Sequence, residues 1–356
     1  MVDHSSRANA PQKLSVIVPV RNGGMTLARC LQGLAESDYS HFEVIVVDDW
    51  STDNTPQIVE RSGAQFLRAP QPMGPGGARN WGARHATGEI MVFVDADVVV
   101  PPEILRLFAE DFLDDPDLAA VFGSYDDTPA RQNFLSQYKN LMHHYVHQIS
   151  SESAVTFWAG CGAMRKAVFD EFGGFDAEKY PQPSIEDIAL GHRLHVAGRK
   201  IRLDKRIQAK HLKRWTLRSL LRADIYCRAV PWTKLILESR KIPRDLNLAY
   251  ASQLSAFLVV GVLTSFVLIG LHVVGLMRLP WLPPLAAMVA AMIALLALNW
   301  DVYRFFFRKR GFWFATRVVP AHWFYYLYSS ATFALCAAIH FTSSPMSSAR
   351  RVTKQG

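Results

Sequence analysis

The sequence predicts an α/β protein: a mostly parallel sheet with helices on both faces, followed by apolar helices of membrane-spanning length. Two observations give this fold class. Within residues 13–100 short apolar runs alternate with helix-like segments, and such a β-α-β-α order is typical of a parallel sheet. After residue 245, long stretches carry no charge. The chain has 356 residues, 50% of them hydrophobic, which excludes a disordered protein and allows one large domain with an appendage.

Apolar runs bounded by turn-forming residues are the predicted strands, and the segments between them are the predicted helices. The strands comprise residues 14–18, 43–47, 65–67 and 90–94. The helices comprise residues 26–36, 55–61 and 78–86. Because ligands of parallel sheets bind at the carboxyl ends of the strands, we expect the segments that follow the four strands to share one crevice.

The four segments at the strand ends are rich in acids, glycines and arginines. They are Pro19–Gly24, Asp48–Thr55, Gly74–Gly82 and Asp95–Asp97. Asp95 and Asp97 cannot both be buried without compensation, and a hard divalent cation, Mg²⁺ or Mn²⁺, is the simplest partner for them. Glycine-rich segments beside them suit the oxygens of a diphosphate. Taken alone, such an acidic pair is also typical of a helix cap or a turn.

This series of motifs resembles the inverting family 2 glycosyltransferases of the membrane-anchored bacterial type. Three further segments match that family in order: the acceptor-side loop at Trp158–Arg165, the GGFD turn at Phe172–Asp176, and the ED motif at Ile185–Leu194. The resemblance covers residues 13–230. It implies the GT-A fold, the nucleotide-diphospho-sugar transferase fold with a Rossmann-like, mostly parallel sheet.

The resemblance also implies individual roles. The residues that would bind the nucleotide-sugar are Pro19, Arg21, Asp49, Arg79 and Asp95. Asp97, together with Asp95, would hold the metal. Asp187, beside Glu186, would be the catalytic general base that takes a proton from the acceptor hydroxyl. The alternative for this acidic pair is a helix amino terminus, where the helix dipole favours carboxylates.

The acceptor side is expected at two segments. One contains Gly160, Cys161 and Gly162. The other, His211–Trp215, resembles the QxxRW motif of the processive and ceramide-type branches but has His in place of Gln. Arg214 could hold a phosphate and Trp215 could stack on a sugar, or the pair could anchor an interface helix. Both interpretations remain open, and processivity is therefore doubtful.

Basic charge and apolar residues are segregated along the chain. Residues 199–244 carry fifteen Lys or Arg against three acids, a local charge of +12, whereas the whole chain has +8. Residues 246–277 and 279–300 are then almost free of charge, and each is long enough to cross a membrane. Residues 318–348 form a third, weaker candidate. The Lys/Arg bias predicts a multi-pass protein of the inner (plasma) membrane with a cytoplasmic catalytic domain.

The predicted organisation has four parts. They are a disordered N-terminus (1–12), a cytoplasmic catalytic domain (13–213), basic amphipathic interface helices (214–245) and a membrane region with two to three transmembrane helices (246–345). Pro231 is expected to break the interface helices. Their basic face suits an anionic membrane surface, and a solvated face is the alternative. A full third crossing would place Arg350 and Arg351 outside, against the charge bias.

The predicted function is a metal-dependent inverting glycosyltransferase that moves a single sugar onto a membrane lipid, giving a cell-envelope glycolipid. The expected partners are a nucleotide-sugar, with uridine as its base by resemblance, and a polyprenyl phosphate or lipid alcohol; no nucleic acid is expected. The alternatives are a processive polysaccharide synthase and a non-catalytic nucleotide-sugar-binding scaffold. A nucleotidyltransferase would leave the ED helix without a role.

Cysteines and histidines outside these motifs are assigned no chemistry. Four widely spaced cysteines exclude a disulfide scaffold and a zinc ribbon, and Cys161 is expected to fill space rather than act as a nucleophile. His143, His144 and His147 have helical spacing, and a surface or acceptor-facing role is favoured over metal binding.

Overall fold

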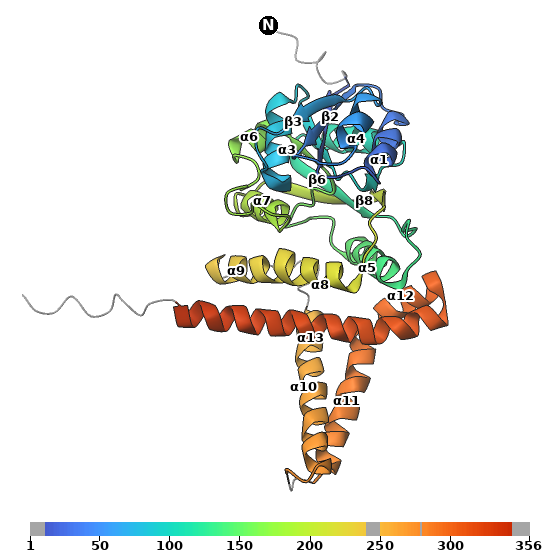
Figure 1. Ribbon diagram of the computed structural model, residues 1–356, viewed down its shortest axis with the longest axis vertical. Helices are drawn as coiled ribbons and strands as arrows, with labels where there is room; N and C mark the ends of the chain where they lie inside the picture. Colours follow the sequence, from blue (N-terminus) through green and yellow to red (C-terminus); the bar gives the residue numbers. More distant parts are fainter. Residues whose placement is uncertain (1–10, 240–249, 278–279, 344–356) are drawn as a thin grey trace, which may run out of the picture. The chain divides into compact units, whose positions relative to one another are not determined.

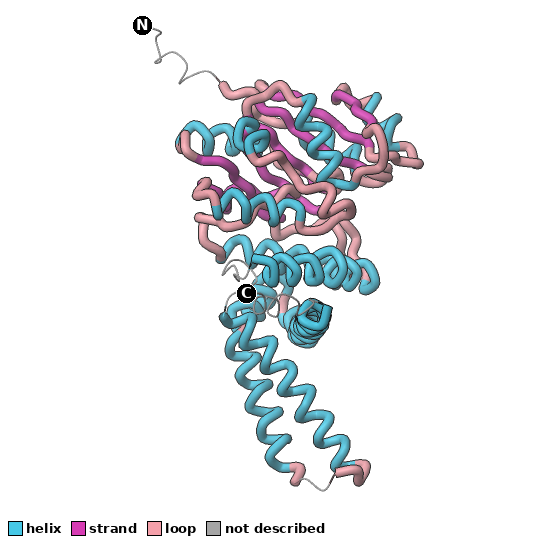
Figure 2. The backbone as a smooth tube through the Cα atoms, turned by 90° about the vertical axis from the view of Figure 1, so that its left-hand side faces the viewer, coloured by secondary structure: helices cyan, strands magenta, loops and turns pink. Residues whose placement is uncertain are grey.

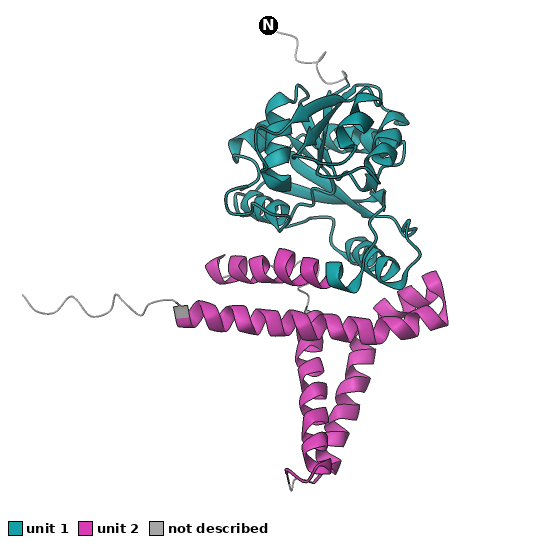
Figure 3. Ribbon diagram, viewed as in Figure 1, with its two compact units in different colours: residues 1–220, 244–247 teal, residues 221–243, 248–356 magenta. Residues whose placement is uncertain are grey.

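The computed structural model describes residues 11–239, 250–277 and 280–343. The chain divides into two compact units, a first unit of residues 1–220 with 244–247 and a second unit of residues 221–243 with 248–356 (Figure 3). Most of the predicted disordered N-terminus, the end of the predicted interface helices and the beginning of the membrane region lie outside the described residues.

The first unit contains an eight-stranded mixed sheet in the order β3-β2-β1-β4-β7-β6-β8-β5 (Figure 1). The strands are β1 (Leu14–Val20), β2 (Phe42–Asp48), β3 (Gln65–Arg68), β4 (Ile90–Val94), β5 (Val98–Val99), β6 (Leu118–Tyr125), β7 (Cys161–Arg165) and β8 (Lys200–His211). The first four strands are parallel, as predicted, and β6 is parallel to β8. Strand β7 runs antiparallel to β4 and β6 and joins the two parallel blocks.

Helices cover both faces of this sheet, because alternate residues of each strand point to opposite sides. Val16 and Val18 pack on the side of α1 (Leu27–Ala35), α2 (Thr55–Glu60) and α4 (Ile104–Asp114). Ile17 packs on the side of α3 (Gly74–His85), α6 (Lys166–Glu171) and α7 (Glu186–Val196). The core is therefore two apolar layers, one on each side of the sheet.

The predicted strands and helices of residues 13–100 are all present, and one boundary is wrong. Gly74–Gly77, expected as a loop, is the first turn of α3. Pro75 lacks an N–H and fits this first turn without loss. Asp49 stabilises the helix start, since its carboxylate accepts hydrogen bonds from the N–H groups of Met73 (2.8 Å) and Gly74 (3.0 Å).

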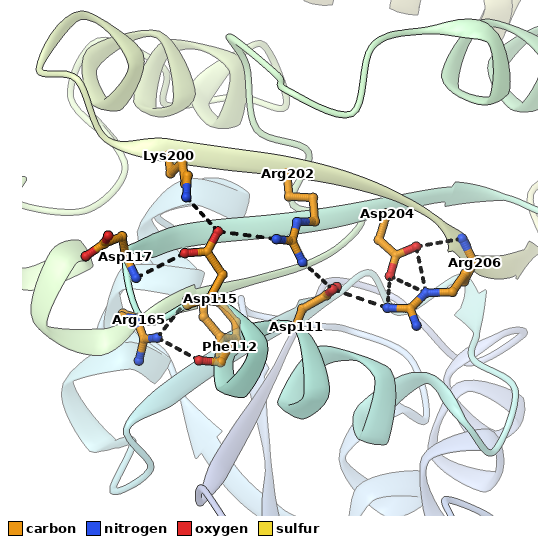
Figure 4. Close-up of polar contacts among 9 residues, drawn as sticks. All are labelled: Asp111, Phe112, Asp115, Asp117, Arg165, Lys200, Arg202, Asp204 and Arg206. Carbon is orange, nitrogen blue, oxygen red and sulfur yellow. Dashed lines mark hydrogen bonds and ion pairs between the residues drawn. The ribbon is translucent and has the colours of Figure 1, made fainter. Parts of the chain in front are cut away.

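Part of the basic run is the strand β8, whose cations pair with carboxylates of the first unit. In β8, Arg202 lies 2.8 Å from Asp111 of α4, and Arg206 lies 2.7 Å from Asp204 (Figure 4). Lys200 pairs with Asp115 at 2.9 Å. These cations neutralise carboxylates of the first unit, so only part of the local charge is available to a membrane surface.

Beyond the sheet, α8 (Leu217–Asp224), the π-helical turn η1 (Ile225–Ala229) and α9 (Val230–Ser239) follow one another without a gap. The expected break at Pro231 is therefore wrong. Proline is tolerated in the first turn of a helix, and the π-helical turn directly before α9 accommodates the change in hydrogen bonding.

The second unit contains α10 (Tyr250–Val273), α11 (Leu282–Leu298), α12 (Trp300–Arg310) and α13 (Phe312–Ser343). Helices α10 and α11 lie side by side, and α13 runs across them (Figures 1 and 2). Among the described residues one helix, 251–273, is long and apolar enough to cross a membrane, or two if α11 and α12, bent by 61°, form one span. This is weak evidence for a membrane, and it corrects the expectation of up to three spans.

Candidate active site

A buried ion triad connects three of the predicted site segments. Arg79 of α3 lies 2.6 Å from Asp95, which follows β4, and 3.0 Å from Glu186 at the start of α7. Burial opposes the charge of Arg79, but the two carboxylates raise the pKa of its guanidinium. Arg79 is 5% exposed, so its single cation compensates part of the charge of these two acids within the protein.

The second acid of the Asp95–Asp97 pair faces an imidazole. The carboxylate of Asp97 lies 3.5 Å from Nε2 of His211, at the end of β8. Burial opposes ionisation of Asp97, but the contact with His211 outweighs it and lowers the pKa of the carboxyl. For Asp95 the balance is the reverse, because burial raises its pKa in spite of Arg79.

Asp187, the predicted base, lies in the first turn of α7 next to Glu186. Its carboxylate accepts hydrogen bonds from the N–H groups of Ala159 (3.0 Å) and Ile188 (2.8 Å). Burial and the negative charge of Glu186 raise the pKa of Asp187 to about 6. A carboxyl with this pKa is ionised at neutral pH and is a stronger proton acceptor than an ordinary aspartate.

The segments after β1 and β2 hold each other in strained conformations. Asn22 and Trp50 have positive φ angles of 56° and 63°, which non-glycine residues rarely adopt. The N–H of Asn22 donates to Ser51 at 2.8 Å, and that of Asp49 donates to the carbonyl of Val20 at 2.8 Å. Arg21 is exposed and Pro19 is half-buried in β1, so this corner combines a fixed backbone with an exposed cation.

The acceptor-side residues separate into two groups. Gly160 is next to the triad, because its carbonyl accepts a hydrogen bond from the N–H of Asp95 at 3.1 Å. Cys161 and Gly162 are buried in β7, where burial raises the pKa of the Cys161 thiol to about 12 and leaves it unreactive. The expectation that Cys161 fills space is therefore supported.

Arg214 and Trp215 differ in exposure. Arg214 is exposed, whereas Trp215 is 5% exposed and its main chain is held by α5 (Phe134–Ile149) through hydrogen bonds with Ser136 and Asn133, both 2.8 Å long. Lys213 lies over the indole, 4.5 Å from the ring centroid. This environment favours an anchoring role for Trp215 over stacking on a sugar.

Of the three histidines of α5, expected in a surface or acceptor-facing role, His144 and His147 are buried and His143 is half-buried. His144 and His147 are 7% and 6% exposed, and their Nδ1 atoms bond the carbonyls of Tyr125 (2.8 Å) and Gly123 (2.9 Å). His143 contacts Trp158 of the predicted acceptor-side loop, with ring centroids 4.7 Å apart. The contact between these histidines and β6 was not predicted, because residues that meet only through tertiary packing produce no pattern in the local sequence.

A divalent cation fits the Asp97–His211 pair. Among the residues that the structure describes, no three His, Cys, Asp or Glu side chains are placed to hold a metal ion. One carboxylate with one imidazole nitrogen is nevertheless a suitable partial set, since Mg²⁺ and Mn²⁺ commonly complete their coordination with water and substrate phosphates. His211 is thus a candidate ligand that the sequence marked only as a departure from a motif.

Comparison with known proteins decides the family. Residues 15–173 match the family described as Glycosyl transferase family 2. This segment is a family 2 glycosyltransferase domain. The prediction of a glycosyltransferase is confirmed for this domain, which contains the triad residues Arg79 and Asp95.

Curated relatives share this domain. TarS of Staphylococcus aureus (strain Mu50), a poly(ribitol-phosphate) beta-N-acetylglucosaminyltransferase, is 42% identical over 101 residues, or 26% of this chain and 18% of TarS. The glycosyltransferase GlyG of Streptococcus pneumoniae serotype 4 is 30% identical over 117 residues, or 32% of this chain and 38% of GlyG. The chain thus spans less than two fifths of the length of these relatives.

A solved structure extends the comparison beyond the domain. The mannosyltransferase PcManGT from Pyrobaculum calidifontis, in complex with GDP-Man and Mn2+, has a TM-score of 0.55 and 18% identity, and covers 95% of this chain and 89% of that chain. At this identity the likeness shows the fold alone. The predicted GT-A architecture is confirmed.

Proposed function

We propose that the protein is a metal-dependent, inverting glycosyltransferase that moves one sugar from a nucleotide-sugar to a membrane lipid. The observation that carries the proposal is the convergence of Arg79, Asp95, Glu186 and Asp187, from three distant segments of the family 2 domain and the chain after it, on one edge of the sheet. A triad with a purely structural role would have no need of Asp187, the adjacent carboxyl group whose pKa is raised.

On the donor side, the leaving nucleoside diphosphate gains negative charge as the glycosidic bond to it breaks. Asp97 and His211 would hold a divalent cation, which supplies electrophilic stabilisation of that charge. Asp95, fixed by Arg79, would orient the ribose. The structural relative PcManGT is in complex with GDP-Man and Mn2+, which supports a nucleotide-sugar and a divalent cation as the ligands of this site.

On the acceptor side, Asp187 would take the proton of the attacking hydroxyl. Its two hydrogen bonds with backbone N–H groups fix the carboxylate, so that the acceptor need only approach from the side of Gly160. A positioned base of this kind contributes roughly 10²–10⁴-fold to the rate. Attack opposite the leaving group inverts the anomeric carbon.

A lipid acceptor is supported by the residues after the sheet. Helix α8 exposes Arg218, Arg222 and Leu217, and α10 is apolar along its length. A basic, amphipathic helix suits anionic headgroups, and an apolar helix suits hydrocarbon. The same features support the proposed location at the plasma membrane with a cytoplasmic domain.

The test is release of nucleoside diphosphate by the full chain in lipid nanodiscs. A panel of UDP- and GDP-sugars is supplied with Mn²⁺ or Mg²⁺, with and without a total lipid extract. Asp187→Asn is the inactive variant. Asp170→Asn is its matched control, because Asp170 is an exposed aspartate of α6 whose ion pair with Lys166 lies at the surface.

We expect release that requires one donor, the metal and lipid, and that disappears in Asp187→Asn but not in Asp170→Asn. A ladder of products would establish the processive alternative, which the 24% identity with the poly-beta-1,6-N-acetyl-D-glucosamine synthase of Staphylococcus aureus over 204 residues also brings forward. Donor binding with no release under any condition would support the non-catalytic scaffold.

A further inference from the structure

Tyr125, the last residue of β6, contacts the candidate metal ligand through its ring. The rings of Tyr125 and His211 are stacked face to face, with centroids 4.1 Å apart and planes inclined by 8°. Tyr125 also contacts His143 (4.4 Å) and the edge of Trp158 (4.9 Å). The ring of Tyr125 is therefore the centre of a cluster of aromatic and imidazole groups that includes His211.

Helix α5 holds the main chain of Tyr125 on both sides of the residue. The N–H of Tyr125 donates to Nδ1 of His143 at 3.4 Å, and its carbonyl pairs with Nδ1 of His144 at 2.8 Å. Since a carbonyl only accepts, His144 carries its proton on Nδ1, whereas His143 must present a bare Nδ1. The end of β6 is thus fixed by two consecutive histidines: His143 accepts a hydrogen bond from it and His144 donates one to it.

The main chain of His211 is also fixed, but its ring needs a separate constraint. His211 pairs with Val98 of β5, and its carbonyl accepts a hydrogen bond from the N–H of Ala130 at 3.3 Å. An imidazole ligand must in addition be turned so that one nitrogen faces the metal, and a neighbouring group usually supplies that orientation. The face of Tyr125 is the group stacked on this ring.

We propose that Tyr125 is a positioning residue for the metal: its ring holds the imidazole of His211 in the plane in which Nε2 faces Asp97. This inference rests on the proposed metal-dependent function. It also gives the histidines of α5 a role, which is to support Tyr125 without ligating the metal. Loss of a hydrogen-bonded partner of a metal-ligating imidazole weakens metal binding by about tenfold to a hundredfold, and we expect loss of this stacked ring to have an effect at the lower end of that range.

The test measures Mn²⁺ binding by the full chain in nanodiscs, in the presence of UDP, from the electron paramagnetic resonance signal of free Mn²⁺. Tyr125→Phe keeps the aromatic face and should bind Mn²⁺ as the unsubstituted protein does. Tyr125→Leu removes that face and should raise the Kd for Mn²⁺ about tenfold or more. Tyr138→Leu is the matched control, because Tyr138 is on α5 but stacks on Phe134.

A spectroscopic readout separates orientation from packing. Spin-echo modulation of bound Mn²⁺ detects a coordinated imidazole nitrogen, which should be present in Tyr125→Phe and Tyr138→Leu, and weakened in Tyr125→Leu. Equal Kd values and equal nitrogen signals in Tyr125→Leu and the unsubstituted protein would overturn the inference alone. Absence of Mn²⁺ binding by the unsubstituted protein, or binding unaffected by Asp97→Asn, would overturn the metal site itself and this inference with it.

Discussion

The two units differ in the kind of side chain that each exposes. In the first unit, Phe93, Phe108 and Phe122 have no exposed surface, and Arg79 pairs inside the protein with Asp95 and Glu186. In the second unit, α10 turns Phe257 (77% exposed) and Phe266 (66%) outward. The first unit thus keeps large apolar side chains such as Phe93 in its interior.

The interior of the second unit contains hydrogen-bonded polar side chains beside apolar ones such as Leu295. Asn299 donates to Ser255 at 2.9 Å, and Tyr326 donates to Asn299 at 3.0 Å, which links α10, the end of α11 and α13. Where the surroundings are as apolar as the side chains, packing and hydrogen bonds hold helices together in place of the hydrophobic effect. The comparison therefore supports hydrocarbon as the environment of α10 and α11.

The largest effect is expected where the first unit depends on a buried charge. Arg79→Leu leaves the buried Glu186 and the half-buried Asp95 without their cation, which costs about 3–5 kcal/mol of unfolding free energy. Urea unfolding and nucleoside diphosphate release measure both consequences, and activity should be lost. Arg106→Leu is the control, because Arg106 pairs with acids at the surface and its loss should leave the urea midpoint almost unchanged.

The next effect tests the apolar exterior of the second unit. Phe266→Asp places a carboxylate on the exposed face of α10, and a charge at the centre of a bilayer costs about 2.5–3.5 kcal/mol. Vesicle flotation should show reduced membrane retention. The same substitution at Phe66, exposed on β3 of the first unit, should not change flotation; equal loss in both variants would remove the distinction between the units.

A smaller effect concerns the ionisation of the base. Burial and Glu186 raise the pKa of Asp187 to about 6, and only the ionised carboxylate accepts a proton. The value of kcat should therefore be constant above that pH and fall about tenfold for each pH unit below it. A pH profile at saturating donor and lipid measures this, and a flat profile from about pH 5 to pH 7 would assign the base elsewhere.

The smallest effect is expected inside the second unit. Asn299→Leu removes the hydrogen bonds with Ser255 and Tyr326, and such bonds between membrane helices contribute about 0.6 kcal/mol each. Thermal denaturation in nanodiscs should show a slightly lower Tm, and nucleoside diphosphate release should be retained. A collapse of the fold would instead mean that Asn299 organises the whole unit.

The sequence was informative where local pattern determines structure. The four strands of residues 13–100 have continuous apolar runs, and their order places Asp95 and Asp97 at the correct edge of the sheet. Strand β8 was not recognised, because its alternating residues are basic and their partners, such as Asp111, lie about ninety residues earlier in the chain. Charges that pair over such distances look like an exposed surface in the sequence.

The site was predictable in its residues but not in its pairings. Asp187, Arg79 and Asp95 were named from motifs, yet no local signal shows that Arg79 bridges Asp95 and Glu186. His211 was visible as an exception to a motif. Tyr125 carried no signal at all, since its importance arises only from the stacking of β6 against the end of β8.

The antiparallel strand β7 also determines which parts of the candidate site meet. It is the seam between two blocks, β3-β2-β1-β4 and β6-β8, each with its own parallel register. The proposed donor residues lie mainly in the first block, while His211 and the α5 histidines belong to the second. Asp97, which follows β4 of the first block, and His211 of the second block therefore meet only as long as the five residues Cys161–Arg165 join the two blocks.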